Sequence, residues 1–299
     1  MADPLALAER HRRAAVALQR RTEGLSARVW RGLDTGNLDR SWIVDVRPSL
    51  VGLVMVAQRQ AASGADDYTA AVLEAQGIPD TAGGEIVPAQ FAGVASDGRP
   101  LDSLLYEPVI TTKVAIGRGA PAREAAAAGL AQLLMVVGTQ VADAGRTADG
   151  VAIATRPRAG GYVRMLSLPS CDRCVILAGK FFRLNTGFQR HPRCDCRHIP
   201  STENLADDLT TDPRKAIESG QVRGLSASDT RAIVDGADPG AVVNARRGMY
   251  EAGGRKLTRE STTRHGFSPG LRPRPEQIYR DATSRDEAVD LLRRFGYIR

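Results

Sequence analysis

The sequence has few aromatic residues and no long apolar run. Aromatic residues make up 5% of the 299 residues, so a packed core has to be built mainly from Ala, Val and Leu. The longest nearly unbroken apolar runs, 50–57 and 130–138, are far shorter than the roughly 18 residues that a membrane-spanning helix needs. Charged residues also follow the N-terminus too closely for a signal-peptide core. These absences predict a soluble chain that has no membrane span and is not exported.

Cysteine is scarce as well. Four cysteines in a chain of this length are too few for a disulfide scaffold. The apolar fraction of 42% and the charged fraction of 25% are close to globular averages, which excludes general disorder and collagen-like repeats. The length suits one large domain or two ordinary ones.

Lysine is scarce too, and the basic charge is concentrated in two segments. Residues 156–198 carry nine basic and two acidic side chains, and residues 240–299 carry thirteen and seven, whereas residues 1–155 carry 15 and 17. Only four of the 41 basic residues are lysines. Arginine suits contacts with phosphate and anchors at interfaces, although a GC-rich genome produces the same bias.

The first half of the chain has the apolar periodicity of helices that pack on one another. His11 falls on the charged face of the first helix, where we expect it to be solvated. Residues 78–100 are rich in Gly and Pro and predict an irregular loop. The expected helices span 4–32, about 37–63 with Pro48 as a break or kink, 68–76, 101–116 and 121–144.

The pattern changes after Gly145. The alternating segments 151–157 and 161–168 predict a β-hairpin. Beyond the cysteine-rich segment, short helices are expected at about 202–220, 226–236 and 239–247, an extended stretch at 252–275 and a closing helix at 284–295.

The strongest motif is the segment 170–198, which holds every cysteine. Cys171 and Cys174 form a C-x2-C pair, and Cys194 and Cys196 form a C-x-C pair. Zinc prefers a tetrahedral set of thiolate and imidazole ligands, and the spacing between the two pairs is typical of a two-knuckle zinc site. With all four ligands supplied by the protein, the site would be closed and structural.

The fourth ligand is open, because C-x-C is a tight bite and His191 restores ordinary spacing as His191-Pro-Arg-Cys194. The set is therefore Cys171, Cys174 and Cys194 with either Cys196 or His191. A disulfide pair, a redox pair and four unrelated thiols are the alternatives to zinc.

The sequence contains no convincing catalytic set and no sign of a small-molecule substrate. The segment 266–270 matches G-x-S-x-G formally but lies in a Gly/Pro-rich stretch. The segment 117–122 matches the pattern of a dinucleotide-binding loop only loosely. Basic side chains around the cysteines are candidates for contact with nucleic acid or a protein partner, the alternative being a solvated basic face: Arg156, Arg158, Arg173, Arg190, Arg193 and Arg197.

The segment CDRC…GFQRHPRCDC resembles the signature of the phage Mu protein F-like head morphogenesis proteins, the minor capsid proteins of tailed bacteriophages. The chain is most similar to the branch from phages and prophages of actinobacteria, through GADPGAVVNARRG and the closing EQIYRDATSRDEAVDLLRRFGYIR as well. The similarity is specific over about 160–299 and general in texture over 1–160.

That resemblance implies a structural protein of the phage head that is assembled in the bacterial host cytoplasm and lies inside the head or at the portal vertex. Its implied partners are the portal protein and the major capsid protein, with packaged DNA as a further candidate. Some members of this branch are labelled capsid maturation proteases, so proteolysis of scaffold or capsid protein is the alternative function. A free-standing DNA-binding zinc protein is a third.

Together these observations predict an α+β chain that is mainly α. We expect a helical N-terminal domain over 1–145, then a β-hairpin and zinc-knuckle module over 146–200. An Arg-rich C-terminal region with short helices and a partly extended course would follow over 201–299.

Overall fold

A computed structural model gives the fold, and it describes residues 2–78, 80–183, 196–246, 248–259 and 272–298. The chain divides into two compact units. Unit 1 contains residues 1–165 and 181–209, and unit 2 contains residues 166–180 and 210–299. The cysteine-rich segment is thus shared between the two units, whereas the sequence predicts three consecutive parts.

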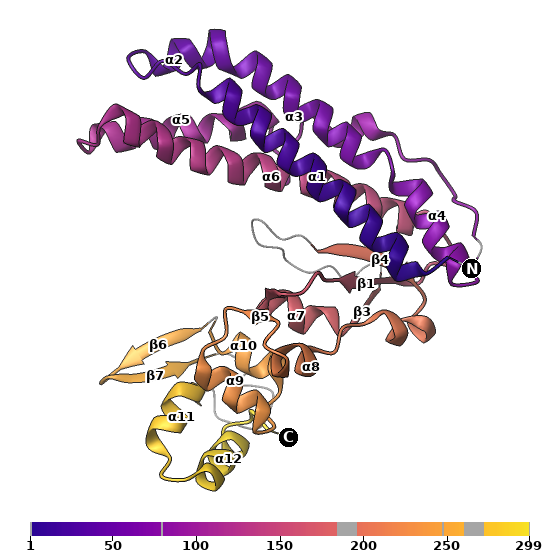
Figure 1. Cartoon of the computed structure of the whole chain (residues 1–299), viewed down its shortest axis with the longest axis vertical. Coiled ribbons are helices and arrows are strands. Elements are labelled where there is room, and N and C mark those ends of the chain that lie inside the picture. The colour runs from indigo at the N-terminus through magenta and orange to yellow at the C-terminus, as the bar shows by residue number, and fades with distance from the viewer. Residues whose placement is uncertain (1, 79, 184–195, 247, 260–271, 299) are drawn as a thin grey trace. The chain divides into compact units, whose positions relative to one another are not determined.

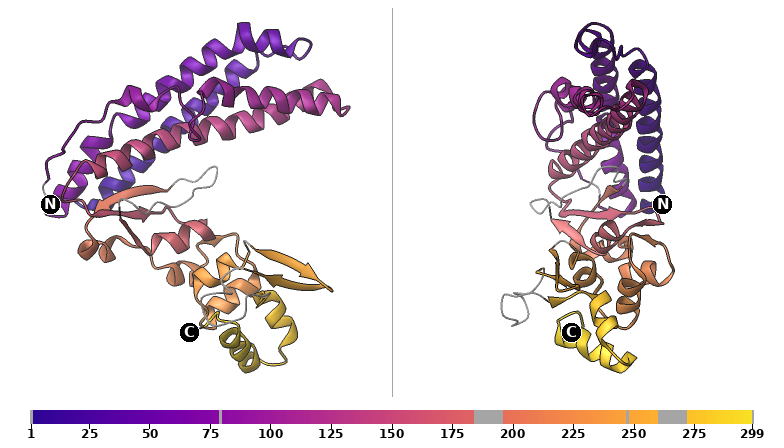
Figure 2. Two further views of the ribbon diagram at one scale, coloured as in Figure 1. Left: turned by 180° about the vertical axis from the view of Figure 1, so that it is seen from behind. Right: turned by 90° about the vertical axis from the view of Figure 1, so that its left-hand side faces the viewer.

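Unit 1 is built on a bundle of four long helices, which Figures 1 and 2 show from three directions. Leucine and valine side chains and two tryptophans fill its core, with Leu50, Leu105 and Leu133 fully buried. The expected helical half is therefore confirmed. The bundle helices are α1 (Pro4–Trp30), α3 (Arg47–Ala62), α5 (Leu101–Gly117) and α6 (Ala122–Ala154), and α4 (Ala65–Ala75) packs on α1 and α6.

Short elements join the long helices. The helix α2 (Leu38–Ser41) leads into a π-helical turn, η1 (Trp42–Val46), and a 3-10 turn, η2 (Pro88–Phe91), lies in the expected loop. Pro48 does not break a helix, because it stands in the first turn of α3, where a missing N–H costs little.

The predicted hairpin of residues 151–157 with 161–168 is wrong. Residues 151–154 are the last turn of α6, where Ala148 and Ala152 pack one helical turn apart against Ala62 and Ala65. Small apolar residues had suggested strand alternation, but they serve a close helix contact instead. The second segment does form a strand, β1 (Gly161–Met165), which pairs antiparallel with β3 (Phe181–Arg183) and β4 (Arg197–Ser201).

Within the described residues, one helix is long and apolar enough by length and composition to cross a membrane, namely α6. Half of its most apolar window is buried inside the protein. Its buried face also carries Arg146 and Asp149, which bond to other parts of unit 1. A core helix of a globular bundle has these properties.

Unit 2 consists of short helices and two small sheets, one of two strands and one of three. Its core contains Val175, Ile233, Ile278, Leu292 and Tyr297, all essentially buried. The elements are β2 (Ser170–Cys171), α7 (Asp172–Ala178), α8 (Pro213–Glu218), β5 (Val222–Arg223), α9 (Ala227–Val234), α10 (Pro239–Asn244), β6 (Met249–Ala252), β7 (Arg255–Thr258), β8 (Arg272–Pro273), α11 (Pro275–Asp281) and α12 (Arg285–Arg294), and the 3-10 turns η3 (Glu203–Leu205) and η4 (Asp207–Leu209) belong to unit 1.

The helix ends in unit 2 follow the capping signals in the sequence. Ser226 and Asp229 form a reciprocal capping box at the start of α9, and the Ser284 side chain accepts the N–H of Glu287 at the start of α12. The expected short helices near 226–236, 239–247 and 284–295 are thus confirmed.

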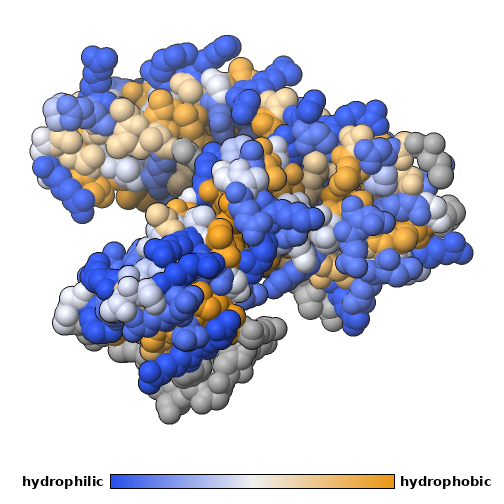
Figure 3. Space-filling model, turned by 60° about the horizontal axis from the view of Figure 1, so that its bottom comes forward, coloured by the Kyte–Doolittle hydropathy of each residue, from blue (hydrophilic) through white to orange (hydrophobic). Residues whose placement is uncertain are grey.

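The described chain is mainly helical with small sheets, so its fold class is α+β, as predicted. Polar and charged side chains surround smaller apolar areas on the face shown in Figure 3.

Gly129 lies where α6 closely approaches α5 and Trp30 of α1, and it offers a direct test of the bundle packing. A Cβ at this position would lie 2.7 Å from the carbonyl oxygen of Pro108 and 2.8 Å from the Trp30 ring. We expect Gly129→Ala to lower the free energy of unfolding by about 1–3 kcal/mol, because the backbone has to move. Gly150→Ala, in the same helix with open space around it, should raise it by about 0.5–1 kcal/mol. Denaturant titration of both variants checks this, and equal effects would contradict the packing.

Candidate functional site

The first half of the predicted zinc motif forms a single tight turn in unit 2. Cys171 ends β2 and caps the N-terminus of α7, where its Sγ accepts the backbone N–H of Cys174 at 3.4 Å. Cys174 is buried, and Cys171 is partly exposed. An N–H group directed at a sulfur stabilises negative charge there, which suits a thiolate.

The turn is held by neighbours on both of its sides. The strand β2 pairs in parallel with β5, with Cys171 opposite Arg223, and the N–H of Ser170 bonds to the carbonyl of Gln221 at 3.1 Å. Beyond the turn, Val175 is fully buried in the core of unit 2. The cysteine pair therefore sits on a supported backbone and not on a loose loop.

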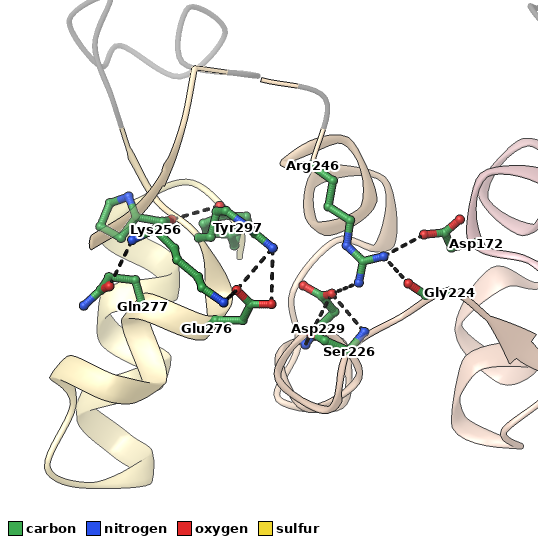
Figure 4. Close-up of polar contacts among 11 residues, drawn as sticks. Asp172, Gly224, Ser226, Asp229, Arg246, Lys256, Glu276, Gln277 and Tyr297 are labelled. Atoms are coloured by element: carbon green, nitrogen blue, oxygen red, sulfur yellow. Dashed lines mark hydrogen bonds and ion pairs between the residues drawn. The ribbon is translucent and has the colours of Figure 1, made fainter. Parts of the chain in front are cut away.

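A third support comes from Arg246, just after α10 (Figure 4). Its Nη1 lies 3.2 Å from the Asp172 carboxylate, between the two cysteines in sequence, and also donates to the carbonyl of Gly224. Its Nη2 bonds to the carboxylate of Asp229 in α9. One guanidinium thus joins three chain segments.

The acceptors of Arg246 are themselves fixed. Asp229 is almost fully buried and accepts hydrogen bonds from the backbone N–H and the hydroxyl of Ser226 at 3.1 and 2.7 Å. Gly224 has a φ of +96°, and a Cβ on it would lie 3.5 Å from the Asp172 carboxylate. That distance is an ordinary van der Waals contact, so it is the positive φ, which glycine adopts without strain, that favours glycine at this position.

A second ionic group in unit 2, also drawn in Figure 4, ties the sheet to the closing helices. Glu276 of α11 lies 3.2 Å from Lys256 Nζ and 3.1 Å from Arg274 Nη2, and the hydroxyl of Tyr297 donates to the carbonyl of Pro273 at 2.9 Å. These contacts hold the C-terminal segment in the unit.

Of the remaining predicted metal ligands, the structure describes only Cys196. Cys196 belongs to unit 1 and is buried, with its Sγ accepting Nη2 of Arg164 at 3.0 Å and its carbonyl accepting Nε of Arg146 at 3.0 Å. Cys194 and His191 lie outside the described residues, as do Arg190 and Arg193. Among the described residues, no three His, Cys, Asp or Glu side chains form a group that could hold a metal ion.

Two of the predicted partner-binding arginines are internal. Arg156 is buried and donates to the carbonyls of Asp80 and Asp66, and Arg197 is buried beside Asp149. Neither is on the surface where contact with a partner was expected. Arg158 and Arg173 are exposed.

Unit 1 contains a buried ionic cluster that the sequence analysis missed. The Asp149 carboxylate is fully buried and lies 3.1 Å from Nε2 of His11 and 4.0 Å from Nη1 of Arg197. The His11 ring stacks on Tyr68 at 3.9 Å between centroids, and the Tyr68 hydroxyl donates to the carbonyl of His198 at 2.6 Å. His11 is therefore not the solvated residue expected of it.

The cluster shifts the pKa values of its members. Burial by itself would raise the pKa of Asp149, but the bond from His11 and the charges of Arg197 and His198 hold it below its ordinary value. Burial lowers the pKa of Arg197, against the attraction of Asp149, and raises that of Tyr68. The carboxylate remains charged, and the cluster joins α1, α4, α6 and β4 as an internal tie.

The contacts of Arg246 and the buried cluster around Asp149 could not be predicted from the sequence. Arg246 lies in the VVNARRG segment, and Asp172 lies inside the C-x2-C motif, so each was within a motif but nothing predicted that they meet. Asp149 and His11 are 138 residues apart and belong to no motif. Buried ion pairs between distant segments leave no spacing to detect.

No family model, no curated protein and no solved structure matches this chain.

We expect Asp149→Ala to lower the free energy of unfolding by about 3–5 kcal/mol, because the change leaves the buried Arg197 without its carboxylate. The matched control is Asp102→Ala, which breaks the partly exposed pair with Arg47 and should cost no more than about 1 kcal/mol. Denaturant titration measures both, and equal losses would contradict a structural role for the buried cluster.

The lowered pKa of Asp149 also predicts a pH dependence. A carboxylate whose pKa is lower in the folded protein stabilises the fold above its unfolded pKa, and that contribution is lost as the pH falls through the folded pKa. The difference in unfolding free energy between wild type and Asp149→Asn should therefore shrink as the pH falls below about 4. A difference that grows on acidification would contradict this.

Proposed function

We propose that this chain is a bacteriophage minor capsid protein with a structural role in head morphogenesis. It would bind the portal protein and the inner face of the capsid during head assembly or DNA packaging. The observation that carries the proposal is the segment CDRC…GFQRHPRCDC, supported by GADPGAVVNARRG and the closing segment, all of which resemble the Mu F-like head proteins.

The arrangement of unit 2 supports this proposal. The three segments that carry the resemblance there are far apart in sequence, yet they share contacts. Arg246 of the VVNARRG segment bonds to Asp172 of the C-x2-C turn. Tyr297 and Leu292 of the closing segment lie in the same core as Val175 of α7. Segments that must fit one another in the fold have a physical reason to occur together in a sequence family.

The proposed metal is zinc, bound through Cys171, Cys174 and Cys194 with Cys196 or His191 as the fourth ligand. The cysteine turn of unit 2 suits such an ion, because its backbone already directs an N–H group at the Cys171 sulfur. Bound zinc would contribute folding free energy and no reaction chemistry, since no ligand position is left open. The exposed Arg158 and Arg173 remain candidates for contact with DNA or an acidic protein surface.

The zinc proposal predicts that Cys171→Ser and Cys194→Ser each lose bound metal and solubility, because a closed structural site stabilises the fold directly. His191→Ala should be severe and Cys196→Ser mild if histidine is the fourth ligand, with the reverse order if sulfur is. Elemental analysis and a thiol count on the purified variants measure this, and folded, metal-free cysteine variants would overturn the proposal.

Co-expression with the portal and major capsid proteins of a tailed actinobacteriophage tests the head role. We expect the chain to sediment with assembled heads or with portal, and the capsid protein to keep its full length. Shortened capsid or scaffold protein, no longer produced by point variants of this chain, would instead establish the protease. Tight duplex binding that weakens steeply with salt, without head association, would establish a DNA-binding protein.

A further inference from the structure

We propose that Arg246 is the positioning residue of the Cys171–Cys174 turn, fixing it in its metal-binding conformation before a metal ion binds. This inference deepens the proposed zinc site and rests on it. The observation behind it is the guanidinium shared by Asp172, Gly224 and Asp229 (Figure 4).

Asp172 lies between the two cysteines and connects their turn to Arg246. Asp172 follows Cys171 directly and lies in the first turn of α7. A bond to its side chain therefore restrains the orientation of that turn. The bond from Arg246 Nη1 to its carboxylate, at 3.2 Å, comes from a segment 74 residues further along the chain. A contact of this kind restrains the turn from outside its own backbone.

The bonds of Arg246 are largely shielded from water. The side chain of Arg246 is 23% exposed, that of Asp172 is 14% exposed and that of Asp229 is 2% exposed, so water competes weakly for these bonds. Asp229 is held in turn by Ser226. A planar guanidinium with several fixed donors spans three acceptors in a way that a lysine ammonium does not.

A turn that Arg246 already holds in place should bind a metal ion more tightly. A cysteine pair that is already in place loses less conformational entropy when an ion binds, so binding is tighter. Outer groups that orient metal ligands typically contribute 10- to 100-fold to affinity. Arg246 therefore acts through the backbone of the turn, without contact with the ion.

The test compares full-length wild type with Arg246→Met and with the matched control Arg285→Met. Arg285 also pairs with an aspartate of the α9 region, Asp235, but at the opposite end of that helix from Asp229. Chelator competition measures the zinc dissociation constant, and hydrogen exchange of the metal-free chain measures protection of the Cys174 amide. We expect zinc to bind 10- to 100-fold more weakly to Arg246→Met and as in wild type to the control. The Cys174 amide should exchange faster only in Arg246→Met.

Unchanged zinc affinity in folded Arg246→Met would overturn the inference. If wild type itself binds no zinc, the proposed metal site fails, and the amide exchange decides the positioning role alone: faster exchange in Arg246→Met supports it and equal exchange overturns it. If Arg246→Met does not fold, Asp172→Asn weakens only the contact with the turn and leaves the pair of Arg246 with Asp229. The same loss of zinc affinity is then expected, and full affinity would again overturn the inference.

Discussion

The guanidinium of Arg246 is the contact on which the candidate site depends. Unit 2 is made of helices of six to ten residues, each too short to be stable alone, so its shape has to come from contacts between them. An apolar core joins these helices, but a small core does not fix the angle of a single turn. The bonds from Arg246 to Asp172 and Asp229 do so for the turn that carries Cys171 and Cys174.

Unit 1 is larger, and its helices are held together mainly by an apolar core, with one buried ionic cluster in addition. Its long helices bury a continuous apolar core, which supplies most of the free energy. Replacing the whole buried group of Asp149, His11 and Arg197 by apolar side chains would change the net stability little, because desolvation offsets their mutual attraction. Removing Asp149 alone is costly, because it leaves the buried Arg197 without its carboxylate. What the structure shows is that this carboxylate links α6 to His11 of α1 and to Arg197 of β4.

Much of the secondary structure could be predicted from the sequence, because helices with a clear apolar period and recognisable caps need only local information. The helices expected at 226–236 and 284–295 are present as α9, which Ser226 caps, and α12, which Ser284 caps. The prediction failed at 151–154, where small residues that pack helix against helix resemble the alternation of a strand. It failed again for His11, Arg156 and Arg197, because partners far away in the chain decide whether a polar side chain is buried. The C-x2-C turn could be found from spacing alone, but the support from Arg246 could not.

We propose that Cys171 and Cys174 hold a structural zinc ion in a phage head protein. X-ray absorption at the zinc edge of the purified full-length chain tests it most directly, because the spectrum reports the number and type of ligands. We predict one zinc with three or four sulfur ligands at about 2.3 Å, the fourth ligand being a nitrogen at about 2.0–2.1 Å if it is His191. A chain that retains no zinc, or zinc bound only by oxygen and nitrogen, would contradict the account.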